Sequence, residues 1–402
     1  MIRPGVLRTS LGLAGIATLA ASGPACQSGV SAASCSLAQV ASYPASPLML
    51  LQDARLERVP DGFFLLGADK DVVRWAHIDA QRAAGKEQSA PVPAARKGGP
   101  WIAIAGRNAP GDTVLIAYGV AAANGKDLDI NVVAAPADGA SAPGSATVAA
   151  TIVGGAASGA APLVALGTGQ SGMRAGLAWT ATGSGNLTAL VLDGSGHADG
   201  SSFSVDAAAR VDCVGFVPGK DELSLAYFKY SSDADTQPTW VIAEIPQAGS
   251  LNTLSLMLLV ESPSCPLVVP TADGYTLAWQ TAAGSAVGVY QASLNAFQEH
   301  LFSSAVEFGG PSLQPPLAGL SVAGNDVIVV VALAGKGEAW RVSPKGARVG
   351  GAVIFPSESG DLGSISSAPV MSGLYSSYAD YEPTGAPPAT AGQRYLLETT
   401  CL

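Results

Sequence analysis

The segment CPLVVPTADGYTLAWQ, residues 265–280, has a near-copy upstream in CVGFVPGKDELSLAYF, residues 213–228. Cysteine aligns with cysteine, Val-Pro with Val-Pro and Leu-Ala-Trp with Leu-Ala-Tyr, at a constant offset of 265 − 213 = 52 residues. In each copy a short apolar run ends in a turn that contains Gly and Asp, and a second apolar run with the aromatic residue follows. Runs of this length between turn residues are typical of β-strands. The two segments therefore indicate a repeated unit built from strands.

The Leu-Ala-aromatic motif recurs along the chain at a spacing of roughly fifty residues. Clear copies stand at 116–118, 177–179, 225–227 and 277–279, and degenerate copies at 62–67, 326–333 and 373–380. A polar loop and a third apolar run follow each copy, as in WVIAEI at 240–245. Periods of about 40–50 residues in a strand-rich sequence are typical of propeller blades. The sequence therefore predicts an all-β fold, a seven-bladed β-propeller with four strands in each blade.

The recurrent Ala beside a Tyr or Trp has a physical explanation in such a fold. A four-stranded sheet cannot bury both of its faces alone, so it stacks on a neighbour. The small residue lets the neighbouring sheet approach closely, and the aromatic ring fills the wider space further out. We therefore expect Ala226 and Ala278 to lie between sheets, where a larger side chain does not fit.

Ring closure is predicted from a second short repeat. The tetrapeptide LMLL stands at 256–259, just before the unit that contains Cys265, and again at 48–51. By position, residues 48–51 are expected to form an outer strand whose own sheet has no earlier strands. The missing strands lie in 364–399, so the N-terminal strand would complete the C-terminal blade and remove exposed sheet edges.

The cysteines fit this arrangement. Cys401 ends the last blade and Cys35 precedes the closing strand, so a bridge between them would join the two ends of the ring. Such a bridge closes a loop of almost the whole chain, for which chain-entropy models give about 4–5 kcal/mol. Cys213 and Cys265 hold equivalent positions in adjacent blades, where a disulfide and two free buried thiols both remain open.

The N-terminus resembles a secretory signal. Arg3 and Arg8 are followed by a short apolar core, Leu11 to Ala21, and then by small residues and Cys26. Cys26 resembles the lipidation site of bacterial lipoproteins, although Gly23 stands where Leu is usual; lipidation and simple cleavage nearby both remain open. Lipidation would leave four of the five cysteines to pair. We divide the chain into a signal peptide (1–25), a linker (26–46) and a propeller domain (47–402).

Composition excludes several classes of partner. The net charge of −10 and the isoelectric point near 4.7 argue against nucleic acid and anionic membranes. Mean hydropathy is +0.31, but past the N-terminus the only long apolar stretch, 146–167, is interrupted by Gly, Ser, Thr and Pro162. We expect a monomer that contacts a membrane only through a lipid anchor.

No residue stands out as catalytic, metal-binding or cofactor-binding. His77, His197 and His300 are expected in blades that are not neighbours, so a three-histidine metal site is not predicted. In DGSGHADG (193–200), Asp193, Ser195 and Asp199 imitate a calcium loop, but Val191 and His197 occupy two of its ligand positions. We favour a simple hairpin there, as in VSPKGARVGG (342–351).

The blade period, the Leu-Ala-aromatic copies and the signal segment resemble secreted bacterial β-propeller repeat proteins, many of them lipoproteins of undefined function. The resemblance implies an exported protein, in the cell envelope or outside the cell, and assigns no catalytic residue or cofactor. The function we expect is a non-enzymatic binding or scaffold module for a protein or glycan partner. The alternative is a polysaccharide-active hydrolase or lyase with carboxylates near the central channel.

Overall fold

Strands account for the regular structure of the described residues, because short apolar runs alternate with turns there. The computed structural model describes residues 35–51, 54–59, 61–69, 72–92, 102–107, 113–138, 144–156, 162–169, 174–180, 185–217, 222–246, 251–257, 265–271, 274–283, 286–295, 300–302, 306–308, 317–324, 326–333, 336–343, 347–356, 365–370, 373–381 and 392–401. The signal peptide and Cys26 lie outside these residues. None of the described segments forms a helix with the length and apolarity needed to cross a bilayer.

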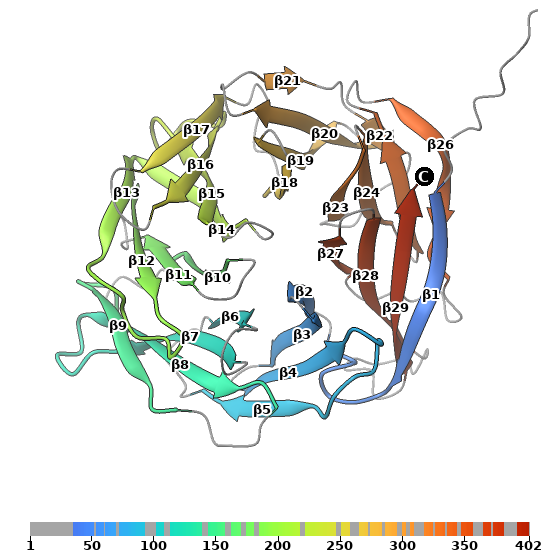
Figure 1. Ribbon diagram of the computed structural model, residues 1–402. Coiled ribbons are helices and arrows are strands. Elements are labelled where there is room, and N and C mark those ends of the chain that lie inside the picture. The colour runs from blue at the N-terminus through green and yellow to red at the C-terminus, as the bar shows by residue number, and fades with distance from the viewer. Residues whose placement is uncertain are drawn as a thin grey trace, which may run out of the picture. The chain divides into compact units, whose positions relative to one another are not determined.

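Each sheet is an antiparallel meander whose strands follow one another from the centre of the ring to its rim (Figure 1). The first sheets contain β2 (Arg55–Val59), β3 (Gly62–Asp69), β4 (Val72–Asp79) and β5 (Gln88–Pro91); then β6 (Ile102–Arg107), β7 (Thr113–Ala121), β8 (Leu128–Pro136) and β9 (Thr147–Ile152); then β10 (Val164–Thr168), β11 (Ala175–Thr180), β12 (Gly185–Leu192) and β13 (Phe203–Ala208); then β14 (Arg210–Phe216), β15 (Leu223–Tyr230), β16 (Thr239–Ile245) and β17 (Asn252–Met257).

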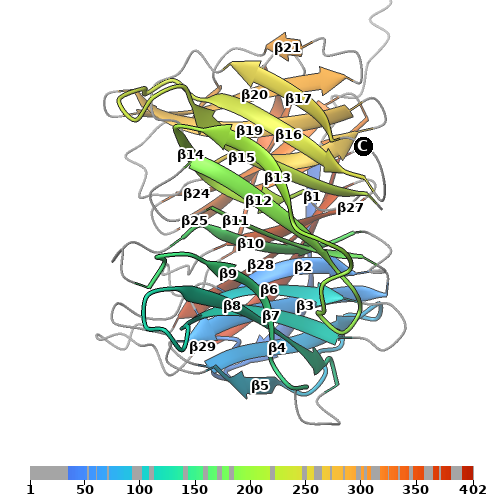
Figure 2. The same ribbon diagram turned by 90° about the vertical axis from the view of Figure 1, so that its left-hand side faces the viewer.

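The later sheets differ in how their outer edges are built. They contain β18 (Leu267–Thr271), β19 (Gly274–Ala283) and β20 (Ala286–Asn295), with both β21 (His300–Phe302) and β22 (Val306–Phe308) paired to β20; then β23 (Leu317–Ala323), β24 (Asp326–Leu333), β25 (Lys336–Val342) and β26 (Arg348–Ile354); and finally β27 (Ser366–Val370), β28 (Gly373–Tyr381), β29 (Gly392–Cys401) and β1 (Cys35–Pro44). Neighbouring sheets follow the order of the sequence around the ring (Figure 1), and Figure 2 gives the side view of the β6–β9, β10–β13 and β14–β17 sheets. The predicted all-β propeller is confirmed.

The buried side chains lie between sheets, because every sheet has one neighbour on each face. Along β3, Phe63 and Leu65 pack with residues of the last sheet, and the alternating Phe64 and Leu66 pack with residues of the β6–β9 sheet. The same division holds around the ring, so each sheet shares one buried cluster with the sheet before it and one with the sheet after it. Strands buried on both faces explain the continuous apolar runs of the sequence.

The Leu-Ala-aromatic motif places a small side chain and a large side chain at these interfaces. In each clear copy the aromatic residue faces the preceding sheet and the Ala faces the following one. The Ala of one copy therefore shares a cluster with the aromatic residue of the next. The pairs are Ala117 with Trp179, Ala178 with Tyr227, and Ala226 with Trp279. The prediction that Ala226 and Ala278 lie between sheets is confirmed, and the small and the large residue of each pair come from different sheets.

The closing strand lies earlier in the chain than predicted. Strand β1 pairs with β29 from Cys35 opposite Cys401 to Pro44 opposite Gln393, and it lies within residues 26–46, where a linker was expected. The prediction of a strand at 48–51 was wrong, since these residues form a turn. Leu48 and Met49 are buried in the seam between the first and last sheets. A buried turn and a short buried strand leave the same apolar run in a sequence, so periodicity alone does not separate them.

The turn at 48–51 is nevertheless attached to the last sheet. The guanidinium of Arg394 on β29 is fully buried and donates to the carbonyl oxygens of Met49 (2.7 Å) and Leu51 (2.8 Å) and to Ser377 Oγ (3.2 Å). Charge-assisted bonds of this kind are stronger than neutral ones. The N-terminal segment is thus held to the last sheet both by a strand and by this turn.

Replacing the alanine of one interface by a larger residue should destabilise the ring. Ala226 is buried beside Trp279, so we expect Ala226→Leu to lower the free energy of unfolding by about 1–3 kcal/mol. Urea denaturation followed by tryptophan fluorescence measures the change. Ala38→Leu, on the exposed side of β1, is the matched control and should stay within about 0.5 kcal/mol. Equal stability of the two variants would contradict the packing account.

Candidate functional site

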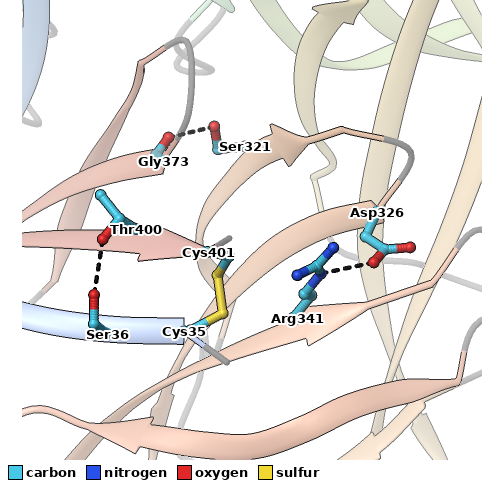
Figure 3. The surroundings of a disulfide bond; sticks show 8 residues. All are labelled: Cys35, Ser36, Ser321, Asp326, Arg341, Gly373, Thr400 and Cys401. Atoms are coloured by element: carbon cyan, nitrogen blue, oxygen red, sulfur yellow. Dashed lines mark hydrogen bonds and ion pairs between the residues drawn. A yellow bond between two sulfur atoms is a disulfide. The ribbon is translucent and has the colours of Figure 1, made fainter. Parts of the chain in front are cut away.

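Two disulfides join elements of the ring that are distant in sequence. Cys35 at the start of β1 and Cys401 at the end of β29 are bridged, 366 residues apart, with their Cα atoms 4.1 Å from each other (Figure 3). Ser36 Oγ and Thr400 Oγ1, the next pair along the strands, are hydrogen-bonded at 2.8 Å. The predicted bridge between the two ends of the propeller is therefore present, and it stabilises the seam mainly by restricting the unfolded chain.

The same seam carries a cluster of aromatic rings around one arginine. Arg82, in the turn after β4, places its guanidinium 4.5 Å from the centre of the Tyr375 ring and 5.5 Å from that of Phe63. It also donates to the Tyr375 hydroxyl, and the Tyr43 hydroxyl donates to the Arg82 carbonyl oxygen at 2.9 Å. These contacts join β1 and β28 of the last sheet to the first sheet. Burial raises the pKa of Tyr43 to about 12.

The second bridge joins neighbouring sheets near the centre of the ring. Cys213 on the innermost strand β14 is bonded to Cys265, two residues before β18. Of the two alternatives left open by the sequence, the structure has the disulfide. The backbone of Cys213 has φ +57°, a left-handed conformation that costs a residue with a Cβ about 1–2 kcal/mol. It lies in an irregularity of the β14–β15 pairing, between Asp212 and Gly215.

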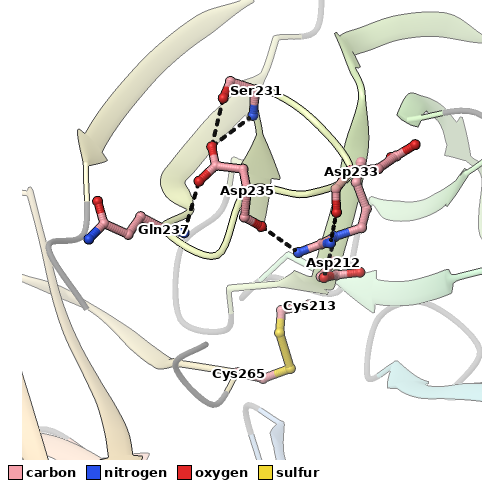
Figure 4. A network of polar contacts seen from close by, with 8 residues as sticks. Asp212, Cys213, Ser231, Asp233, Asp235, Gln237 and Cys265 are labelled. Atoms are coloured by element: carbon pink, nitrogen blue, oxygen red, sulfur yellow. Dashed lines mark hydrogen bonds and ion pairs between the residues drawn. A yellow bond between two sulfur atoms is a disulfide. The ribbon is translucent and has the colours of Figure 1, made fainter. Parts of the chain in front are cut away.

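Beside this bridge lies the best candidate for a functional surface, which we call the Arg210 cluster: Arg210, Asp212, Tyr230, Asp233 and Asp235. Figure 4 shows Asp212, Asp233 and Asp235 of this cluster near the Cys213–Cys265 bridge. Arg210 begins β14, and its guanidinium carbon is 3.7 Å from the centre of the Tyr230 ring. It donates to the carbonyl oxygens of Asp233 (2.9 Å) and Asp235 (3.3 Å). Its Nε lies 3.3 Å from Asp212 Oδ2, an ion-pair distance without hydrogen-bond geometry.

The position of the Arg210 cluster follows from the topology of the meander. Loop 231–238 joins the second strand β15 to the third strand β16, and β14 begins where the chain arrives from the outer strand β13. In an antiparallel meander these two kinds of connection emerge on the same face. The side chains of Arg210 and Asp212 are 37% and 43% exposed, so the cluster is open to solvent on that face.

Asp235 has a structural part in this cluster. Its carboxylate accepts from Ser231 Oγ (2.6 Å), the Ser231 backbone N–H (3.4 Å) and the Gln237 backbone N–H (3.0 Å). These hydrogen bonds, led by that from the Ser231 hydroxyl, lower the pKa of Asp235. The carboxylate therefore stays ionised at neutral pH and shapes loop 231–238.

This geometry suits recognition better than acid catalysis. The cluster brings carboxylates, an arginine and an aromatic ring together, as a glycosidase site would. A general acid, however, needs a carboxyl whose pKa is raised, whereas the pKa of the Asp235 carboxyl is lowered by its hydrogen bonds. The cluster presents the guanidinium charge of Arg210 beside the acceptor oxygens of Asp212, Asp233 and Asp235. Hydroxyl groups or polar protein side chains can form hydrogen bonds with such groups.

The calcium-like loop is a hairpin, as favoured from the sequence. Asp193 Oδ1 accepts from the backbone N–H groups of Ser195 (2.8 Å) and His197 (3.0 Å), and the Asp193 N–H donates to the His197 carbonyl (2.9 Å). The Asp199 N–H donates to the Val191 carbonyl (2.9 Å). Because Asp193 Oδ1 is engaged by backbone donors of its own turn, its local role is to hold the hairpin.

A similar hydrogen-bond pattern recurs in two other sheets, with serine or aspartate as the acceptor. Ser343 Oγ accepts from the Ala347 N–H (3.1 Å), and Asp79 Oδ1 accepts from the Ala83 N–H (2.9 Å). In both turns the first residue also donates its own N–H to the carbonyl of the fifth, at 2.8 Å and 3.0 Å. The recurrence with serine or aspartate indicates a need for an acceptor in the turn rather than a metal ligand.

The three histidines lie in different sheets. The His77 ring on β4 is 3.1 Å from Asp61 Oδ1 and lies against Phe64. His197 belongs to the exposed hairpin between β12 and β13, and His300 begins β21. Within the part of the chain that the structure describes, no three residues among His, Cys, Asp and Glu are grouped to hold a metal ion.

Comparison with solved structures gives matches at low sequence identity. No protein-family model matches the chain, and no curated protein matches it. A prolyl endopeptidase is matched with a TM-score of 0.46 and 14% identity, over 88% of this chain and 51% of that chain. The Dos1 propeller has a TM-score of 0.46 and 8% identity, over 84% and 74%. The Nup133 β-propeller domain of Vanderwaltozyma polyspora has 0.49 and 10%, over 84% and 91%. This chain thus spans about half the length of the endopeptidase.

Buried tyrosines should make the free energy of unfolding depend on pH in the alkaline range. Because the folded state favours the neutral phenol of Tyr43, its contribution is complete below pH 10 and is lost as pH rises towards its pKa of about 12. Burial also raises the pKa of Tyr227 and Tyr378. We expect the free energy of unfolding to fall across this range, and Tyr43→Phe to reduce the fall by about 1–2 kcal/mol. Urea denaturation at several pH values measures this; an unchanged slope in the variant would count against it.

Proposed function

We propose that this chain is an exported β-propeller that acts as a rigid binding or scaffold module for a protein or glycan partner. The observation that carries the proposal is the Arg210 cluster, exposed on one face and held beside the Cys213–Cys265 bridge. Rigid scaffolds that present polar loops reduce the entropy lost on binding. The polar character of the cluster, with one arginine, one buried ring and several acceptor oxygens, suits a hydroxyl-rich or polar partner.

The proposed location is the cell envelope or the exterior of the cell. Two disulfides support this location, because such bonds persist in oxidising compartments. The signal-like segment 1–25 and Cys26 belong to the same proposal, with lipidation of Cys26 as the means of anchoring. The protein would then contact the membrane through the lipid alone and act as a monomer.

We also propose that the ring is a seven-bladed propeller. In this count each four-stranded sheet is one blade, and the sheet that contains β21 and β22 is one further blade. The buried clusters support this count, since each joins two consecutive sheets and the last joins β27–β29 and β1 to the first sheet. The binding face would then carry seven related sets of loops. Variation among these loops would determine the partner.

Binding is tested with a matched pair of arginine variants. Purified protein is screened against a glycan array and against surface-exposed envelope proteins, and the affinity for each hit is measured by calorimetry. We expect Arg210→Ala to weaken binding about tenfold or more. Arg348→Ala is the control, because Arg348 also lies over an aromatic ring, 4.4 Å from that of Trp340, in a different sheet. It should bind as the wild type does.

Two outcomes would contradict the proposal. Equal losses in both variants, with unchanged melting temperatures, would mean that the Arg210 cluster is not the binding surface. New reducing ends or unsaturated uronates released from a bound polysaccharide would mean that the protein is a hydrolase or lyase.

A further inference from the structure

The two disulfides differ in their access to solvent. Cys401 is buried and Cys35 is half-buried within the paired strands β1 and β29. Cys265 is exposed and stands outside any strand, while Cys213 is half-buried. Thiol–disulfide exchange requires a thiolate to reach one of the two sulfur atoms. The Cys213–Cys265 bridge is therefore the more accessible of the two, and Cys265 is its accessible end.

The bridge also holds an unfavourable backbone conformation. Cys213 is one of two non-glycine residues with a positive φ among the described residues. Between the pairs Asp212 with Phe228 and Gly215 with Ala226, Cys213 and Val214 on β14 lie opposite Tyr227 alone on β15. A left-handed residue at such a bulge persists only when its surroundings impose it. The covalent bond to the next sheet is one such constraint, and breaking it permits β14 to relax.

A change in the backbone conformation of β14 would act directly on the exposed loop 231–238. Arg210 is three residues before Cys213 on this strand and binds the carbonyl oxygens of Asp233 and Asp235 in loop 231–238. Arg210 is thus the link between the innermost strand and the loop that shapes the Arg210 cluster. If β14 shifts, these bonds and the contact with Tyr230 shift with it.

We propose that Cys213–Cys265 is a redox modification site, reduced by a dithiol, that controls the shape of the Arg210 cluster. One thiolate of the dithiol attacks Cys265 Sγ and forms a mixed disulfide. The bond to Cys213 breaks with its electron pair on Cys213 Sγ, which takes up a proton. The second thiolate of the dithiol then displaces Cys265 as a thiol, so the bridge gains two electrons and the dithiol leaves as a disulfide. The control of ligand binding rests on the function proposed above; the reduction itself does not.

Reduction is tested on the wild-type protein. The oxidised chain is incubated with increasing dithiothreitol under native conditions, quenched with N-ethylmaleimide and digested, and labelling of each cysteine is measured by mass spectrometry. We expect Cys213 and Cys265 to be labelled together and about tenfold or more faster than Cys35 and Cys401. Equal rates, faster reduction of Cys35–Cys401, or no reduction of either bridge before unfolding would overturn the proposal.

Coupling to the loop is tested by hydrogen exchange without any partner. In the selectively reduced protein and in Cys213→Ser/Cys265→Ser, amides of 211–216 and 231–238 should exchange about tenfold or more faster than in the oxidised wild type. Cys35→Ser/Cys401→Ser is the matched control and should leave 231–238 unchanged. Unchanged exchange after selective reduction would refute the coupling. Faster exchange in a protein that binds nothing through Arg210 would leave the redox site standing and refute the proposed function alone.

Discussion

No sheet of this ring can bury its two apolar faces by itself, and the remainder of the structure depends on this constraint. Along β3, successive residues alternate between two buried clusters, one shared with the sheet before and one with the sheet after. Removing any neighbour would expose one whole face, at roughly 25 cal/mol for each Å² of apolar surface. A linear row of sheets would leave two such faces open. A ring in which the last sheet packs on the first leaves none.

The seam between the first and last sheets is the place where this closure has to be secured, and several independent interactions meet there. Strand β1 completes the last sheet, Cys35–Cys401 joins the two strands covalently, and Arg394 holds the turn at 48–51. Arg82 and its aromatic neighbours then attach the first sheet. The Cys213–Cys265 bridge is different in kind, because it joins adjacent sheets near the centre, close to loops that face solvent. One bridge secures the ring, and the other lies where a surface can be adjusted.

Sequence reasoning reached the architecture because the repeated unit is written in local patterns. The Leu-Ala-aromatic copies and the turn residues follow from packing conditions that recur from sheet to sheet, and the aligned cysteines mark equivalent positions in two of the sheets. It failed at 48–51, since an apolar run records burial and does not record whether the backbone is extended or turned. It also missed the Arg210 cluster. Arg210 lies three residues before Cys213 and about twenty residues before the loop that it binds. No local sequence pattern relates Arg210 to that loop.

From the sequence alone, then, came the strand content, the repeat and the pairing of Cys35 with Cys401. These depend on periodicity and on the equivalence of positions between copies, and both are properties of the linear chain. Only the tertiary structure decided which segment closes the ring, that Cys213 and Cys265 are bonded, and that Arg210, Tyr230 and the 231–238 loop form one surface. Those outcomes depend on distances between side chains of different strands and sheets. Such distances are fixed only when the sheets pack against one another.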